Sequence, residues 1–172
     1  MSRLKNARTL KHLGIVFLAL AGKRWTSYVL MSIALVGPSA YAATLCAPDE
    51  VVVWSCEAKQ KLYSVCASED LTRTTGYMQY RAGQQGNLEL EFPQVKQPAE
   101  GLFHLTLLPR GAVIEFSNGH VNYDLREHLV GRTSIVVARK DEVLGTIECE
   151  VPSDTLTLTP TLNLLENAGL HD

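Results

Sequence analysis

The stretch Val51–Ala67, VVVWSCEAKQKLYSVCA, decides the fold. Its first half is rich in β-branched and aromatic residues, and Lys61–Ala67 alternates between polar and apolar residues. Runs of this kind predict β-strands, and the short Ala58–Gln60 link between them predicts a hairpin. We therefore expect an antiparallel pair at this point of the chain.

The sequence beyond this hairpin continues as short strands separated by turn residues. Within Leu88–Phe92 the apolar residues alternate with glutamates, as in a strand with one buried and one wet face. Asn118-Gly119 suits the positive φ angles of a type I′ turn. The count of about nine strands predicts an all-β fold, an antiparallel sandwich or barrel. The further runs are 77–81, 88–92, 102–108, 112–117, 120–126, 133–138 and 143–151.

Four cysteines follow the first 42 residues, and they allow three pairings. In the predicted hairpin Cys66 lies opposite residue 52 or 53, which puts Cys56 and Cys66 about 13 Å apart, too far for a disulfide. A Cys46–Cys56 bridge is awkward because the first strand carries Cys56 away from the point where the chain enters. We therefore predict two disulfides, Cys46–Cys66 and Cys56–Cys149.

Residues 1–42 are typical of an export signal. Lys23 and Arg24 precede a short apolar run at 28–36, and Ala40-Tyr41-Ala42 offers small residues to a signal peptidase. We predict cleavage after Ala42. A second apolar run at 13–21 leaves two further readings, an unusually long signal or a later start of translation that excludes residues 1–22. An uncleaved anchor is disfavoured because neither run reaches the roughly 18 residues that span a bilayer.

Two segments follow the predicted cleavage point: a β domain at 43–151 and a Thr/Leu-rich C-terminal tail at 152–172. The tail could form an edge strand broken by Pro160, or a loosely held segment with a short helix. Removing residues 1–42 removes six basic residues and leaves ten Lys and Arg against 18 Asp and Glu, a net charge near −8. This charge disfavours nucleic acid and permits a cationic protein or envelope component as partner, although plain solubility explains it as well.

No catalytic motif stands out in the sequence. G-x-S-x-G, H-E-x-x-H and P-loop patterns do not occur, and the cysteine spacings fit neither a zinc knuckle nor a C-x-x-C redox pair. His104 lies within an apolar strand and is expected to be packed in the core, whereas His120 follows a turn and is expected to be exposed. We expect no catalytic residue, no metal, no cofactor, and membrane contact only through the export signal.

The weak candidates for binding lie at two places. Tyr77, Tyr80 and Arg81 share one strand and could present aromatic and polar groups for recognition, while Asn118 and His120 lie at a turn. The alternative for the strand is one tyrosine in the core and one covering it. Trp54 is expected in the core.

Several motifs together resemble a family of small exported bacterial β proteins that are mostly uncharacterised. They are WSCEAKQKLYSVCAS at 54–68, GYMQYR at 76–81, IEFSNGHVNYDL at 114–125, and a strand ending in Cys149. The resemblance implies a periplasmic or secreted protein and carries no catalytic residues.

A looser likeness is to the small periplasmic inhibitors of lysozyme, which are also disulfide-bonded β proteins, but the chain lacks their Ser-Gly-x-x-Tyr loop. We therefore expect a non-catalytic binding or envelope-associated protein. The alternatives are a lysozyme-inhibitor-like protein and a cell-envelope hydrolase.

Overall fold

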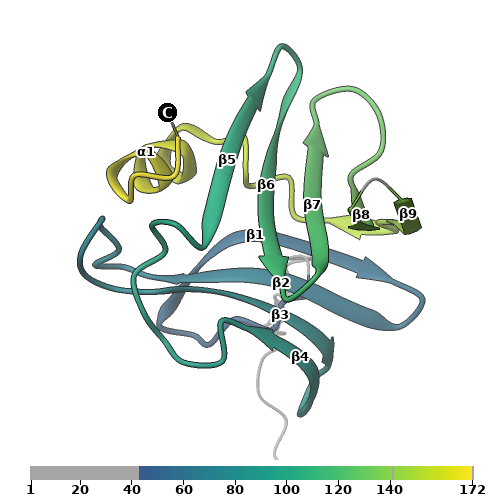
Figure 1. Cartoon of the computed structure of the whole chain (residues 1–172), viewed down its shortest axis with the longest axis horizontal. Coiled ribbons are helices and arrows are strands. Elements are labelled where there is room, and N and C mark those ends of the chain that lie inside the picture. The colour runs from purple at the N-terminus through teal and green to yellow at the C-terminus, as the bar shows by residue number, and fades with distance from the viewer. Residues whose placement is uncertain (1–42, 141, 172) are drawn as a thin grey trace, which may run out of the picture. The chain divides into compact units, whose positions relative to one another are not determined.

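The computed structural model describes residues 43–140 and 142–171, so the predicted export signal at 1–42 lies outside the described residues. The described part contains ten strands and one helix (Figure 1). They are β1 (Glu50–Ala58), β2 (Lys61–Ser68), β3 (Met78–Gln84), β4 (Asn87–Phe92), β5 (Phe103–Leu108), β6 (Gly111–Asn118), β7 (Val121–His128), β8 (Ser134–Arg139), β9 (Glu142–Glu148), β10 (Val151–Pro152) and α1 (Thr159–Asn167).

Two five-stranded antiparallel sheets make up the domain. The first sheet has the order β10-β1-β2-β3-β4, and the second sheet is the meander β5-β6-β7-β8-β9. Figure 1 shows the strands of the second sheet running across those of the first, as in an orthogonally packed sandwich. The predicted all-β sandwich is confirmed.

The two-residue turn between β1 and β2 sets the register of their hairpin. Lys59 and Gln60 both have positive φ, at 51° and 65°, which is the requirement of a type I′ turn. Ala58 therefore pairs with Lys61 across a two-residue loop, and a bulge between Val52 and Trp54 shifts the register further along. The result places Val52 opposite Cys66, as the sequence predicted.

Both predicted disulfides are present. Cys46 bonds to Cys66 and Cys56 bonds to Cys149, each with a Cα–Cα distance of 5.3 Å. Disulfides of this kind persist in oxidising compartments, so the folded domain belongs outside the cytoplasm.

The predicted strand at 143–151 was wrong as a single element, because it forms β9 in the second sheet and β10 in the first. The chain passes from the second sheet to the first between Cys149 and Glu150. The Cys149 N–H donates to Thr133 O, and the Glu150 N–H donates to Glu57 O. The Cys56–Cys149 disulfide therefore fastens the sheets together at the crossing point.

The core lies between the inner faces of the two sheets. Paired positions on the first sheet place Trp54, Val65, Tyr80 and Phe92 in one row across four strands. Phe116 of the second sheet meets this row, with its ring centroid 4.9 Å from that of Tyr80 and 5.0 Å from that of Phe92. Aromatic groups supply most of the buried apolar area here. Trp54 is fully buried, as predicted.

The C-terminal tail packs against the sandwich. Pro160 lies in the first turn of α1, where its missing N–H leaves no hydrogen bond unmade. Leu156, Leu165 and Leu170 are buried, and Leu170 O accepts a hydrogen bond of 2.7 Å from the Leu105 N–H on the edge of β5. The tail thus covers one edge of the second sheet. No helix among the described residues has the length and apolar character needed to cross a membrane.

Candidate functional site

The outer face of the first sheet is covered by the chain that leads into it. Ser55, Ser64 and Arg81 form a cross-strand row on this face, and all three are buried. Ser55 Oγ donates to Ala43 O at 2.7 Å, and Ser64 Oγ accepts from the Leu45 N–H at 2.9 Å. The segment 43–46 therefore lies across the middle of this face and covers it.

Arg81 is the centre of a buried ion cluster under this segment. Its guanidinium donates to Glu50 at 2.5 and 2.8 Å and to Glu91 at 3.1 Å. The side chains of Arg81 and Glu50 are 9% and 1% exposed. Tyr77 donates its hydroxyl to Glu50 at 2.7 Å, and Lys96 donates to the Tyr77 hydroxyl. These contacts hold the start of β1 against β3.

The hypothesis that Tyr77, Tyr80 and Arg81 form an exposed recognition strand is wrong. Tyr80 is 2% exposed and packs in the core, while Tyr77 is half-buried over the ion cluster. β3 is an inner strand of its sheet, and the folded-back segment removes its outer face from solvent. The alternative weighed from the sequence, one tyrosine in the core and one covering, fits this strand.

The surroundings of Glu50 favour the ionised form of its side chain. Burial raises the pKa of a carboxyl group, but the hydrogen bonds from Arg81, the Ala47 N–H and Tyr77 outweigh it. Together they hold the pKa of Glu50 at about 2, against an ordinary 4.5. The carboxylate therefore stays ionised and acts as the anchor of the cluster.

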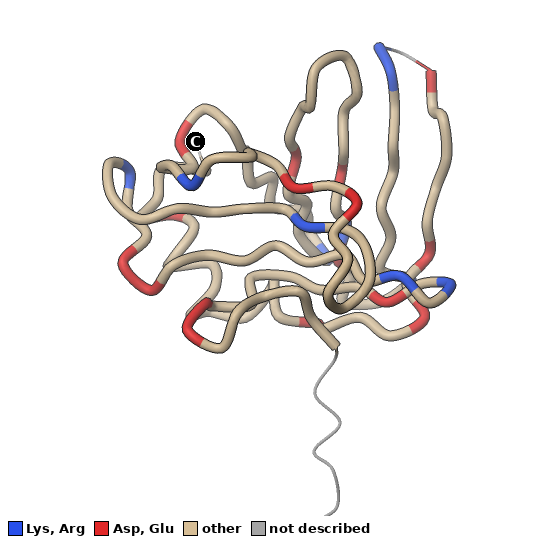
Figure 2. Tube along the Cα trace, turned by 90° about the horizontal axis from the view of Figure 1, so that it is seen from below, with Lys and Arg blue, Asp and Glu red and all other residues tan. Residues whose placement is uncertain are grey.

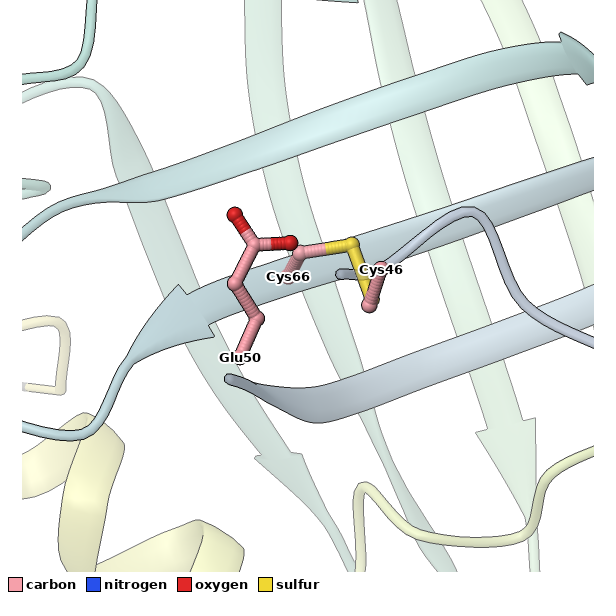
Figure 3. Close-up of side chains that lie close together, drawn as sticks. All are labelled: Cys46, Glu50 and Cys66. Atoms are coloured by element: carbon pink, nitrogen blue, oxygen red, sulfur yellow. A yellow bond between two sulfur atoms is a disulfide. The ribbon is translucent and has the colours of Figure 1, made fainter. Parts of the chain in front are cut away.

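Glu50 also lies beside the Cys46–Cys66 disulfide (Figure 3). The ligand atoms of these three residues lie within 4.8 Å of one another, the spacing of a metal site. The two sulfurs are bonded to each other, however, and metal binding requires a thiolate. The arrangement is structural.

The second sheet presents the opposite situation, because its outer face is open. We call this surface, formed by the outward-pointing residues of β5, β6 and β7, the open face. In Figure 1 it is turned toward the viewer, with the first sheet behind it and α1 to one side. Its members in cross-strand register are His104, Thr106, Val113, Glu115, Ser117, Asn122, Asp124 and Arg126.

Two carboxylates lie directly opposite each other at the centre of the open face. Glu115 on β6 pairs in register with Asp124 on β7, and both are half-buried. Thr106 donates to Glu115 at 2.7 Å, and Arg126 donates to Asp124 at 2.7 Å. Like charges facing each other across two strands destabilise a sheet. Among the described residues of the open face, Arg126 is the one that forms an ion pair with either of these two carboxylates.

Two hollows meet at these carboxylates. The larger, of about 650 Å³, is also lined by Phe92 of the first sheet and by Phe103 and Phe116, so it reaches the end of the core between the sheets. The smaller, of about 290 Å³, extends over the open face toward Arg126 and His128. Glu115 and Asp124 line both. In the smaller hollow the Arg126 Nε–H is buried and has no partner among the described residues. The acidic pair thus borders both hollows.

The turn between β6 and β7 explains why the sequence analysis missed this pair. Gly119 alone has positive φ there, at 65°, and the central residues are Gly119 and His120, as in a type II′ turn. The predicted type I′ turn centred on Asn118-Gly119 was wrong by one residue. With the predicted turn Glu115 would pair with Asn122, whereas with the observed turn it pairs with Asp124.

Of the remaining candidates, Asn118 and His120 lie away from the acidic pair, whereas His104 lies beside it. Asn118 and His120 are exposed at the hairpin tip, as predicted for His120. His104 is exposed and lies opposite Glu115, so the prediction that it packs in the core was wrong. Phe103 and Leu105 take the inner positions of β5 and leave His104 on the open face.

Comparison with known proteins found no matching family model, no matching curated protein and no matching solved structure.

Proposed function

We propose that this chain is an exported, non-catalytic binding protein that takes a cationic ligand on its open face. The observation that carries the proposal is the register of Glu115 against Asp124. Both carboxylates are half-buried on the uncovered face of the second sheet, and both line two hollows. A bound cation relieves the repulsion between them. Binding therefore recovers part of the free energy by which the like-charge pair destabilises the sheet.

The chemistry of the pair suits lysine or arginine groups of a partner. An ionised carboxylate offers about four lone-pair sites. Glu115 uses one with Thr106 and Asp124 uses one with Arg126, so each keeps acceptor capacity. Hydrogen bonds between charged donors and carboxylates are the stronger class. The net charge near −8 after the predicted cleavage adds long-range attraction for a cationic partner.

The two disulfides support a location outside the cytoplasm, and the export signal predicted at 1–42 supports the periplasm or secretion. Partners of the proposed class there are cationic proteins and envelope components. A lysozyme-inhibitor-like role is one case of the same proposal, because lysozyme is a cationic enzyme.

The test titrates the exported protein against a cationic lysozyme and against poly-lysine, at low and at high salt. The double variant Glu115→Gln/Asp124→Asn is expected to weaken binding by about tenfold or more, equivalent to about 1.4 kcal/mol. The matched control is Glu69→Gln/Asp70→Asn, which removes the same charges from an exposed turn away from the face.

Equal weakening by both double variants would show that only net charge matters and would overturn the assignment of the open face. Absence of binding to both probes, with the fold intact by circular dichroism, would overturn the cationic ligand. Inhibition of lysozyme that depends on Glu115 and Asp124 would select the inhibitor role. Peptidoglycan hydrolysis by the protein alone would overturn the non-catalytic proposal.

A further inference from the structure

The edges of the two sheets differ in how they are protected. An edge strand exposes unpaired backbone donors and acceptors, and natural proteins shorten, charge, cover or bend such strands. In the described part of the chain, β10 has two residues and ends in Pro152, while β4 carries Glu89 and Glu91. The edge of β5 is covered by Leu170. Three of the four edges thus have a recognisable safeguard.

The fourth edge, β9, has much less. It is seven residues long, and its central residues Val143–Ile147 carry no charge. Val143 is 61% exposed and Leu144 is 46% exposed. A bulge leaves Leu144 without a residue directly opposite on β8, and this bend is the one protective device in the strand. Figure 2 shows the β8–β9 hairpin, with basic and acidic residues at its tip, standing out from the body of the domain.

We infer that β9 pairs with β9 of a second copy of this chain, in an antiparallel register centred on Leu144. Two possible registers of this two-fold pairing differ in which charged residues face each other. With Gly145 on the axis, Glu142 of each copy would face Glu148 of the other, a like-charge pair made twice. With Leu144 on the axis, Glu142 faces Thr146 instead.

The register centred on Leu144 also fits by size and charge. Val143 lies opposite Gly145 of the second copy, which has no side chain and leaves open space around its Cα. The two exposed Leu144 side chains meet at the axis. Glu148, which is already paired with Arg132, comes level with Lys140 of the other hairpin and not with an acidic residue. This alignment therefore combines an apolar centre with ends at which no two acidic residues of β9 face each other.

The dimer joins two five-stranded sheets into one continuous sheet. The two-fold axis of an antiparallel strand pair is perpendicular to the sheet, so the open faces of both copies lie on the same side. One strand pair buries less than the roughly 800 Å² per partner of a standard stable interface, and we expect reversible, concentration-dependent association. This inference concerns a surface separate from Glu115 and Asp124 and stands whether or not the proposed function is correct.

Sedimentation equilibrium of the exported protein between about 10 µM and 1 mM, the range in which small interfaces associate, tests the inference. The mass is expected to rise toward twice that of the monomer. Leu144→Lys is expected to raise the dissociation constant at least about tenfold. Leu88→Lys is the matched control, because Leu88 is an equally exposed leucine on the edge strand β4, at 47%.

A cysteine scan tests the register. Opposite Cα atoms in antiparallel strands are about 4.5–5.5 Å apart, within the range of a disulfide, so a residue on the axis cross-links to itself. Leu144→Cys is expected to give a covalent dimer under oxidation and Gly145→Cys is not. A monomer over the whole range, equal dissociation by Leu88→Lys, or preferential cross-linking through Gly145→Cys would overturn the inference.

Discussion

Replacing Glu50 by glutamine tests the buried ion cluster. The change keeps the shape of the side chain and removes the charge that holds Arg81, Tyr77 and the Ala47 N–H. The difference between a pKa of about 2 in the folded protein and 4.5 ordinarily corresponds to about 3 kcal/mol, at 1.36 kcal/mol per unit. Because glutamine retains part of the hydrogen bonding, we expect Glu50→Gln to lower the free energy of unfolding by about 2–3 kcal/mol at neutral pH.

The stability that Glu50 contributes depends on pH, and the two pKa values give the direction of that dependence. Glu50 is charged in the folded protein down to about pH 2, whereas the unfolded chain takes up the proton near pH 4.5. Its contribution is therefore complete above the unfolded pKa, declines as the pH falls from 4.5 toward 2, and is absent below that. The stability difference between the natural protein and Glu50→Gln should shrink over the same interval.

Urea unfolding followed by circular dichroism at several pH values measures both effects. Glu89→Gln is the control, because Glu89 and its partner Lys61 have side chains 46% and 42% exposed and their ion pair is screened by water. We expect the control to unfold almost as the natural protein does. A Glu50→Gln variant as stable as the natural protein at neutral pH, or a stability difference that stays constant down to pH 2, would refute the reasoning.

Three further outcomes are expected. Leu165→Ala should cost about 2–5 kcal/mol in urea unfolding because Leu165, on α1, is fully buried, while Leu158→Ala should change little because Leu158 is half exposed. Glu127→Gln should cost about 1–3 kcal/mol in the same measurement, because the buried carboxylate accepts the Leu156 and Thr157 N–H groups and glutamine cannot accept both equally well. Sequencing the amino terminus of the exported protein should give Ala43 as its first residue, and a start more than two residues away would contradict the predicted cleavage site.

Local features of the sequence were enough to predict the strands and the disulfides. Alternation and turn residues depend on neighbours along the chain, so each predicted strand except 143–151, which forms two strands, appears within a few residues of its observed position. The disulfides followed because a hairpin register turns sequence spacing into distance. Cys66 had to lie opposite residue 52 or 53, and Val52 is the residue found there.

Features that depend on distant contacts could not be read in the same way. The sequence around Arg81 does not reveal that segment 43–46 folds back over it and buries it. The acidic pair was missed because a turn displaced by one residue moves each strand partner by two. His104 was misplaced because the apolar residues around it do not say which face of β5 meets the core.

The Cys56–Cys149 bridge has a consequence for survival among extracellular proteases. Its cysteines are 93 residues apart in sequence, and every hairpin loop from β1–β2 to β8–β9 lies between them. A single cut in any of these loops leaves the two fragments covalently joined, each still paired with its neighbouring strands. Nicked protein therefore migrates as one species without reductant and as two species with it. The damage stays local because the broken ends remain held within the same molecule.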